Sequence, residues 1–139
     1  MVDLDKIKIC ICVSTYNKEI TFEALNIATK TLKEKGITNV HAIEVPGAFE
    51  IPVSISRHVK DYNGFIAIGC VIKGETNNFD LITKAITEAL MKLSIKNCKP
   101  IGNALITTFD KEQAKKRVQK GKEAAVAVID VLLNKAKNV

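Results

Sequence analysis

The sequence predicts one α/β domain, residues 1–139, built on a doubly wound parallel sheet. Three observations support this prediction. Short β-branched apolar runs alternate with segments of helical periodicity along the chain. The run at residues 65–72 is apolar on both alternating faces, as in a central strand that helices cover on both sides. Finally, 139 residues with 47% hydrophobic content suit one core, and the chain shows no linker, internal repeat or low-complexity segment.

The first half of the chain contains two predicted strands and two predicted helices. Residues 7–13 form the first strand, with residues 14–17 as its exit loop. A helix follows, with apolar positions at Phe22, Leu25, Ala28 and Leu32 and its end at Gly36. Residues 40–45 form the second strand. The next helix has Pro52 near its start and Gly64 at its end, and its expected apolar rows are Phe49 with Val53 and Ile55 with Val59.

The second half repeats this alternation. Residues 65–72 form the middle strand, and a helix follows with apolar positions at Phe79, Ile82, Ile86, Leu90 and Leu93. Pro100 precedes a strand at residues 101–106. Thr107-Thr108 opens the last helical region, which we expect to break near Gly121 and to continue through Ala125, Val128 and Leu132. Strands that alternate with helices imply right-handed crossovers and a flavodoxin-like three-layer α/β/α sandwich with a four-stranded parallel sheet.

In such sheets, ligands bind outside the carboxyl ends of the strands. The corresponding loops are residues 14–17, 46–50, 73–78 and 107–110. Residues 73–78 combine a glycine turn, a hydroxyl and backbone N–H groups before a helix, which suits an anionic group, although the pattern is no P-loop. Thr76 is interpreted either as a phosphate ligand or as an ordinary N-cap. Glu50 is either a ligand for substrate hydroxyls or a first-turn helix charge.

Composition argues against several classes of function. The net charge of +6 comes from dispersed lysines, and aromatic residues make up only 5%, so we expect no nucleic-acid partner. Lys8, Gly69 and Lys73 interrupt the most apolar regions, so no membrane span is expected. Residues 1–6 lack a signal-peptide profile, and we therefore expect a cytoplasmic protein.

The four cysteines do not form a metal-binding pattern. No C-x-x-C pair is present, and only His41 and His58 could add imidazole ligands. The three cysteines in predicted strands, namely Cys10, Cys12 and Cys70, are interpreted as small apolar residues of the core.

Four segments taken together resemble the lumazine synthase family, from residue 7 to about residue 133. They are Ser14-Thr15-Tyr16-Asn17, Val45 to Pro52, Gly69 to Thr76 and Gln113 to Arg117. The resemblance implies condensation of 5-amino-6-(D-ribitylamino)uracil with 3,4-dihydroxy-2-butanone 4-phosphate, giving 6,7-dimethyl-8-ribityllumazine, phosphate and water in riboflavin biosynthesis. It implies a transferase with no metal and no organic cofactor. It also implies a homopentamer, in some members stacked into decamers or sixty-subunit shells, with riboflavin synthase as a candidate partner.

The resemblance also implies roles for individual residues. Tyr16 would stack on the pyrimidine ring, and Lys120 would lie near the ligand unless it is a solvated helix-end lysine. Asn103 falls where many members carry a phenylalanine that closes the pocket of the neighbouring subunit. The remaining contacts fall into three groups: Ala48, Phe49 and Glu50 for the ribityl chain; Cys70, Val71 and Ile72 for the pyrimidine edge through their main chain; and Glu75, Thr76 and Arg117 for the phosphate.

The chain departs from the family pattern in three places. Asn78 stands at the position of the proton-donating histidine, and asparagine cannot titrate. Lys73 replaces a common arginine, and the segment between Arg117 and Gly121 is shorter than usual. The alternative function is therefore a non-catalytic flavin- or lumazine-binding relative. A flavodoxin-like regulatory domain would instead need an acidic phosphoacceptor where Ser14 and Thr15 stand.

Overall fold

Four parallel strands form a single sheet in the computed structural model, which describes residues 3–139. In chain order they are β1 (Lys8–Ser14), β2 (Asn39–Val45), β3 (Gly64–Ile72) and β4 (Ile101–Thr108), and their spatial order is β2-β1-β3-β4. The four-stranded parallel sheet predicted from the sequence is confirmed. Residues 1–2, which the expectations about domain limits and a signal peptide include, lie outside the described residues.

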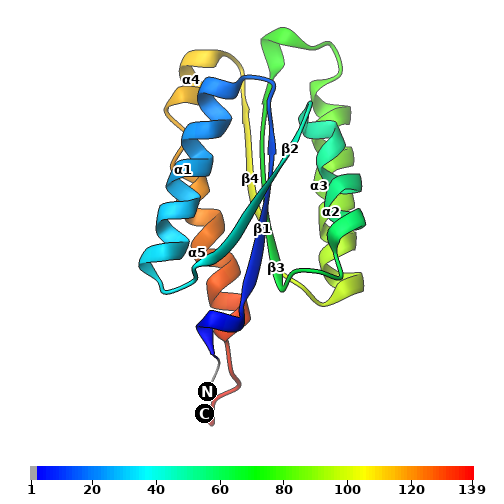
Figure 1. Cartoon of the computed structure of the whole chain (residues 1–139). Coiled ribbons are helices and arrows are strands. Elements are labelled where there is room, and N and C mark those ends of the chain that lie inside the picture. The colour runs from blue at the N-terminus through cyan, green and yellow to red at the C-terminus, as the bar shows by residue number, and fades with distance from the viewer. Residues whose placement is uncertain (1–2) are drawn as a thin grey trace.

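Helices cover both faces of this sheet (Figure 1). One face carries α1 (Lys18–Glu34), α4 (Lys111–Lys115) and α5 (Lys120–Leu133), and the other carries α2 (Ile51–His58) and α3 (Phe79–Asn97). Three single turns of 3₁₀ helix precede β1, α2 and α3: η1 (Leu4–Lys6), η2 (Ala48–Glu50) and η3 (Lys73–Glu75). The predicted three-layer α/β/α arrangement is therefore confirmed.

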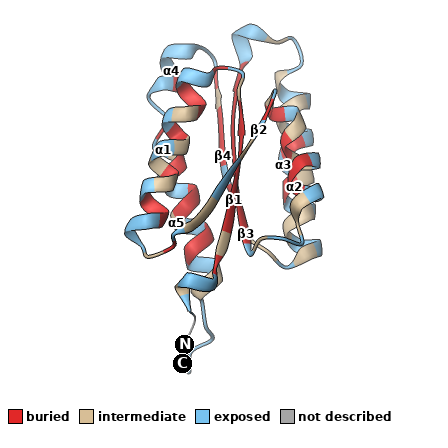
Figure 2. Ribbon diagram, in the orientation of Figure 1, coloured by how far each residue is buried: buried red, intermediate tan, exposed pale blue. Residues whose placement is uncertain are grey.

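The core lies on both faces of β3, whose nine residues are all buried (Figure 2). Ile66 and Ile68 pack toward α1 and α5, whereas Phe65 and Ala67 pack toward α2 and α3. This two-sided burial explains the continuous apolar run in the sequence. The helices also approach closely: a Cβ atom added at Gly102 in β4 would lie 2.6 Å from the carbonyl oxygen of Ala124 in α5.

The structure corrects the predicted apolar row of the second helix. Phe49 and Val53 are about 60% exposed, and the buried positions are Ile51 and Ile55. The reason is that residues 48–50 form the separate 3₁₀ turn η2, which has three residues per turn, so the phase of the α-helix starts only at Ile51.

Two predicted boundaries were wrong, and a third is shifted by a few residues. Gly64 begins β3 instead of ending a helix, and Thr107 and Thr108 belong to β4. The last helical region breaks at the turn of residues 116–119. Gly121 is the second residue of α5, where its missing side chain lets the helix rest against the Ala24 carbonyl of α1.

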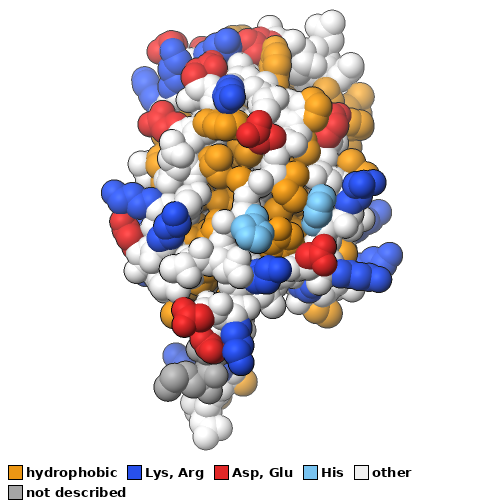
Figure 3. Space-filling view, in the orientation of Figure 1, with side chains coloured by type: hydrophobic (Ala, Val, Ile, Leu, Met, Phe, Trp, Pro, Cys, Tyr) orange, Lys and Arg blue, Asp and Glu red, His pale blue; other side chains and the backbone are white. Residues whose placement is uncertain are grey.

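The surface shows no gathering of one charge sign on the face drawn in Figure 3, where lysine, arginine and acidic side chains are interspersed around apolar patches. Within residues 3–139, no helix is long and apolar enough to cross a membrane.

Candidate active site

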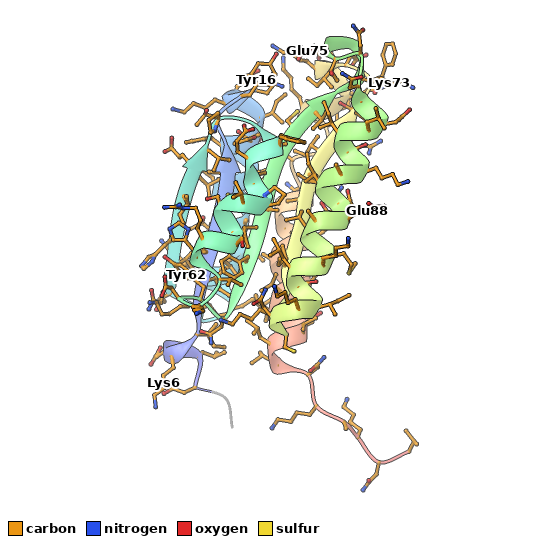
Figure 4. All side chains as sticks on the ribbon, turned by 90° about the vertical axis from the view of Figure 1, so that its right-hand side faces the viewer. Lys6, Tyr16, Tyr62, Lys73, Glu75 and Glu88 are labelled. Atoms are coloured by element: carbon orange, nitrogen blue, oxygen red, sulfur yellow. The ribbon has the colours of Figure 1, made fainter. Side chains whose placement is uncertain are left out.

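A cavity of about 170 Å³ opens at the carboxyl end of the sheet, where loops from three strands meet. Eight of the residues that the sequence singled out line this cavity, and Figure 4 shows two of them, Tyr16 and Glu75, at this end of the molecule. The lining residues are Tyr16, Gly47, Ala48, Phe49, Cys70, Val71, Ile72, Glu75, Thr76 and Ile82. They come together because parallel strands present their carboxyl ends at one edge.

Tyr16 is held at the rim of the cavity by its main chain. The Thr15 N–H donates to the Val45 carbonyl at 2.8 Å, and the Tyr16 N–H donates to the Pro46 carbonyl at 3.0 Å. Pairing between β1 and β2 thus continues into their exit loops. The Tyr16 ring is 61% exposed, so an aromatic face is available to a planar ligand.

Glu50 stabilises the turn that forms the neighbouring wall. Its Oε1 accepts a hydrogen bond from the Gly47 N–H at 2.9 Å. This contact agrees with the interpretation of Glu50 as an acidic residue in the first turn of a helix. The carboxylate does not itself line the cavity, but Ala48 and Phe49 between these two residues do. A carboxylate accepts at both oxygens, so Oε2 remains for a ligand hydroxyl.

The loop of residues 73–78 forms the third wall and a second hollow. The Asn78 N–H donates to the Thr76 hydroxyl at 3.2 Å, and Asn78, not Thr76, is the N-cap residue of α3. The N-cap interpretation of Thr76 is therefore wrong. The second cavity, of about 280 Å³, adjoins the first at Thr76 and has Lys73, Asn78 and Asp80 among its lining residues. Asn78 makes no side-chain capping bond.

The strand cysteines supply no nucleophile at this end of the sheet. Burial raises the pKa of Cys10 to about 12, and of Cys12 and Cys70 to about 11 each, so these thiols stay protonated at neutral pH. Their interpretation as core residues is confirmed by their burial. Among the described residues, no three His, Cys, Asp or Glu side chains are placed to hold a metal ion.

Three further predicted site residues lie along the β4 edge and line neither of these cavities: Asn103, Arg117 and Lys120. Asn103 pairs with Ala67 in mid-strand, and its Oδ1 accepts from the Leu105 N–H at 2.9 Å. It lies five residues before the end of β4, about 16 Å down the strand at the usual rise per residue. Arg117 is exposed on the turn between α4 and α5.

Lys120 lies at the start of a helix but is not a solvated lysine. It begins α5, is half-buried, and its Nζ donates to the Leu105 carbonyl at 2.6 Å. Burial lowers the Lys120 pKa; Glu123 opposes this effect and Arg117 adds to it. The N–H and the carbonyl of Leu105 are thus both hydrogen-bonded to side chains of the same chain, the N–H to Asn103 and the carbonyl to Lys120.

Sequence reasoning missed Ile82 as a cavity residue and Gln113 as a structural contact. Ile82 was assigned to the apolar face of α3, and nothing in its spacing separates a cavity position from a core position. Gln113 stands three residues after Asp110, a spacing typical of a capping box, so a contact with the start of α4 could have been expected, but not its partner at Phe109. Its Oε1 accepts from the Phe109 N–H at 2.9 Å.

Comparison with known proteins agrees with this arrangement. The sequence model of the 6,7-dimethyl-8-ribityllumazine synthase family matches residues 6–136. Proteins of that name from three bacteria are similar to the chain. The protein from Limosilactobacillus reuteri (strain DSM 20016) is 36% identical, covering 90% of this chain and 85% of its own length. The protein from Corynebacterium kroppenstedtii is 35% identical, covering 88% and 81%, and that from Mycobacterium ulcerans is 31% identical, covering 94% and 86%. With a match over nearly its whole length and the motif residues gathered at the strand ends, the chain belongs to the 6,7-dimethyl-8-ribityllumazine synthase family.

Proposed function

We infer that the chain condenses 5-amino-6-(D-ribitylamino)uracil with 3,4-dihydroxy-2-butanone 4-phosphate, giving 6,7-dimethyl-8-ribityllumazine, phosphate and water. The observation that carries this inference is the strand-end cavity, which gathers eight motif residues in a chain that matches the family over residues 6–136. The reaction belongs to riboflavin biosynthesis, and its enzyme is a transferase. A non-catalytic binding relative is not favoured, because the close relatives carry the enzyme's name.

The chemistry requires little from protein side chains. The pyrimidine brings an amine nucleophile that forms an imine with the butanone carbonyl, and the butanone brings its own phosphate leaving group. Elimination of phosphate, ring closure and loss of water then complete the ring. Orientation of two reactants can supply roughly 7 to 11 kcal/mol. A cavity that only positions its substrates can therefore account for much of the rate.

We assign the pyrimidine to the 170 Å³ cavity. Tyr16 stacks on the ring, the main chain of residues 70–72 hydrogen-bonds the ring edge, and the free oxygen of Glu50 accepts from ribityl hydroxyls. The exposure of Tyr16 and the single occupied oxygen of Glu50 support these roles. Ala48 and Phe49 add main-chain contacts from the same wall.

We assign the phosphate of the second substrate to the loop that carries Glu75 and Thr76, with Arg117 supplying a fork of donors. Arg117 lies outside both hollows of its own chain, which supports a site completed by the Arg117 of a neighbouring copy. Asn103 on the exposed β4 edge would close the same boundary. We therefore propose a homopentamer with active sites between subunits, able to stack into decamers or sixty-subunit shells.

Proton transfer must proceed without a histidine at position 78. Acid–base help supplies about 10² to 10⁴-fold in typical enzymes, so its loss slows the reaction without abolishing it. Substrate phosphate, water or Glu75 relays the proton in this proposal. Glu75 lines the strand-end cavity, next to Thr76, which lines both hollows.

The decisive experiment mixes the purified protein with both substrates and follows lumazine fluorescence. We expect the rate to exceed the spontaneous condensation. Binding of lumazine without any acceleration would identify a non-catalytic relative. Sedimentation of the same sample should show a pentamer or a multiple of it, and a stable monomer with full activity would contradict the boundary sites. A cytoplasmic location and contact with riboflavin synthase are further parts of the proposal, tested by fractionation and co-purification.

A further inference from the structure

A chain of hydrogen bonds joins the start of α4 to the loop assigned to the phosphate. The Gln113 side-chain oxygen accepts from the Phe109 N–H at 2.9 Å. The Phe109 carbonyl accepts from the Gly74 N–H, also at 2.9 Å. Gly74 belongs to η3, directly before Glu75 and Thr76. Phe109 is therefore held from both sides, by a helix through its N–H and by the phosphate loop through its carbonyl.

The position of Gln113 makes it suited to hold this connection. Asp110 is the N-cap of α4, and its Oδ1 accepts from the Gln113 N–H at 2.9 Å. In a usual capping box, the side chain at this position would return to the N-cap N–H. Here it reaches one residue further, to Phe109, and the Thr108 hydroxyl donates to the Asp110 carbonyl at 2.8 Å. The strand exit at residues 108–110 is thus closed into one hydrogen-bonded unit with α4.

We propose that Gln113 is a positioning residue for phosphate binding, acting through Phe109 on the loop at Gly74. The proposal rests on the function inferred above. Without the Gln113 acceptor, the N–H of Phe109, whose side chain is exposed, would turn to water and its carbonyl would no longer be aimed at Gly74. The loop that presents Glu75 and Thr76 would then lose its hydrogen-bonded connection to α4 through Phe109, and a less ordered loop would bind phosphate more weakly.

The same unit also supports Arg117. The Lys116 N–H donates to the Gln113 carbonyl at 3.2 Å, and the Arg117 N–H donates to the Ala114 carbonyl at 3.0 Å. In an assembly with sites between subunits, α4 therefore connects the phosphate loop of one site to the arginine of the adjacent site. Gln113 contacts the strand exit at Phe109 through its side chain, but it contacts the turn that carries Arg117 only through its main chain. A substitution of the side chain therefore changes the phosphate loop and leaves the support of Arg117 in place.

The test uses three variants of the full-length protein. Gln113→Met keeps the length of the side chain and removes the acceptor, whereas Gln113→Glu keeps an acceptor oxygen. The control, Glu112→Gln, removes the charge from the exposed contact between Glu112 and Lys115 in the same short helix. The measurements are the KM of each substrate and amide hydrogen exchange of the peptide that contains Gly74.

We expect Gln113→Met to raise the KM of the butanone phosphate about three- to tenfold, which corresponds to loss of one neutral hydrogen bond. The KM of the pyrimidine should stay constant, and the Gly74 amide should exchange faster. Gln113→Glu should keep the Gly74 amide protected, and Glu112→Gln should match the parent protein in every measurement. Gly74→Ala tests the connection from its other end, because the new Cβ would lie 3.1 Å from the Phe109 carbonyl oxygen. It should reproduce the selective rise in the KM of the butanone phosphate.

Two results would overturn the proposal. If Gln113→Met leaves Gly74 exchange unchanged, the connection does not order the loop, whatever the KM values do. If exchange rises while both KM values stay constant, the loop does not determine phosphate affinity. A parent protein that forms no lumazine above the spontaneous rate would instead refute the proposed function, and inorganic phosphate binding to the same variants would then test the role of Gln113 independently.

Discussion

The strand-end cavity and the region around β4 hold most of the residues that the family resemblance assigned to one site. In the cavity, residues from three loops meet within a single chain. Asn103 in the edge strand β4 and Arg117 on the turn between α4 and α5 do not line that cavity, and both are exposed. Lys120, for which the resemblance suggested either a place near the ligand or a solvated helix end, donates to the Leu105 carbonyl.

The two groups of residues differ because they lie at different positions relative to the sheet. Residues after parallel strands converge because all the strands end at the same edge of the sheet. A residue in the middle of an edge strand, such as Asn103, does not join this cluster in its own chain, and in the proposed assembly it would complete a site in another copy. The predictions below test this division.

The largest expected effect is that substitutions in the two regions raise the KM of different substrates. Arg117→Ala should raise the KM of the butanone phosphate roughly ten- to hundredfold, because a charged hydrogen bond contributes about 1.5 to 3 kcal/mol. Tyr16→Ala should instead raise the KM of the pyrimidine, since it removes the stacking surface. Steady-state kinetics with each substrate varied in turn measures both values. Lys116→Ala, next to Arg117, is the control, and equal losses for both substrates would indicate a folding defect.

A somewhat smaller effect should appear when the two variants are mixed. Subunits with Arg117→Ala and subunits with Tyr16→Ala, co-refolded in equal amounts, should regain up to about a quarter of parental sites if each site joins two subunits in a ring. Activity after co-refolding, compared with each variant refolded alone, gives the result. Activity that stays at the average of the two variants would place the whole site within one chain.

A substitution at Asn78, in the loop of residues 73–78, should affect the rate of the chemical step and not the binding of either substrate. Asn78→His should raise turnover several-fold while both KM values stay nearly constant, because asparagine and histidine make similar hydrogen bonds but only histidine titrates near neutral pH. The pH–rate profile, corrected for the uncatalysed reaction, should gain an inflection near pH 6.5. An unchanged rate and profile would mean that another group already carries the proton.

The smallest effect should come from Lys120→Met, which should change stability more than binding. Loss of the bond to the Leu105 carbonyl should lower the free energy of unfolding by about 0.5 to 1.5 kcal/mol. In the parent, the Lys120 pKa lies below its ordinary value of 10.5, so between the two values the unfolded chain binds more protons at this group, and the contribution of Lys120 to stability rises with pH. The three buried thiols, whose raised pKa values have the opposite effect, lower the stability of every variant over the same range. Denaturant titrations should therefore show a stability difference between the parent and Lys120→Met that grows with pH, whereas the difference between the parent and Lys122→Met should stay constant. A large rise in the KM of either substrate in Lys120→Met would indicate that Lys120 contacts a ligand.

Most of the fold could be predicted because its signals are local. The run at residues 65–72 is apolar on both faces, and the structure buries all of β3. Helical spacing from Phe79 to Leu93 became α3, and Gly36, with a φ of 92°, follows the end of α1. The errors fell where two local structures meet, as at Phe49, where a 3₁₀ turn shifts the helical phase, and at Thr107, where β4 extends into the expected loop.

The sequence by itself determined the alternation of strands and helices, the loops that carry the chemistry and the family to which the chain belongs. Only the tertiary structure decided that Lys120 binds Leu105, fifteen residues away, and that Gln113 reaches the loop at Gly74 through Phe109. Periodicity reports which face of an element is buried, because that depends on residues three or four positions apart. It contains no information on which distant backbone group a side chain will meet, since that depends on how the elements pack.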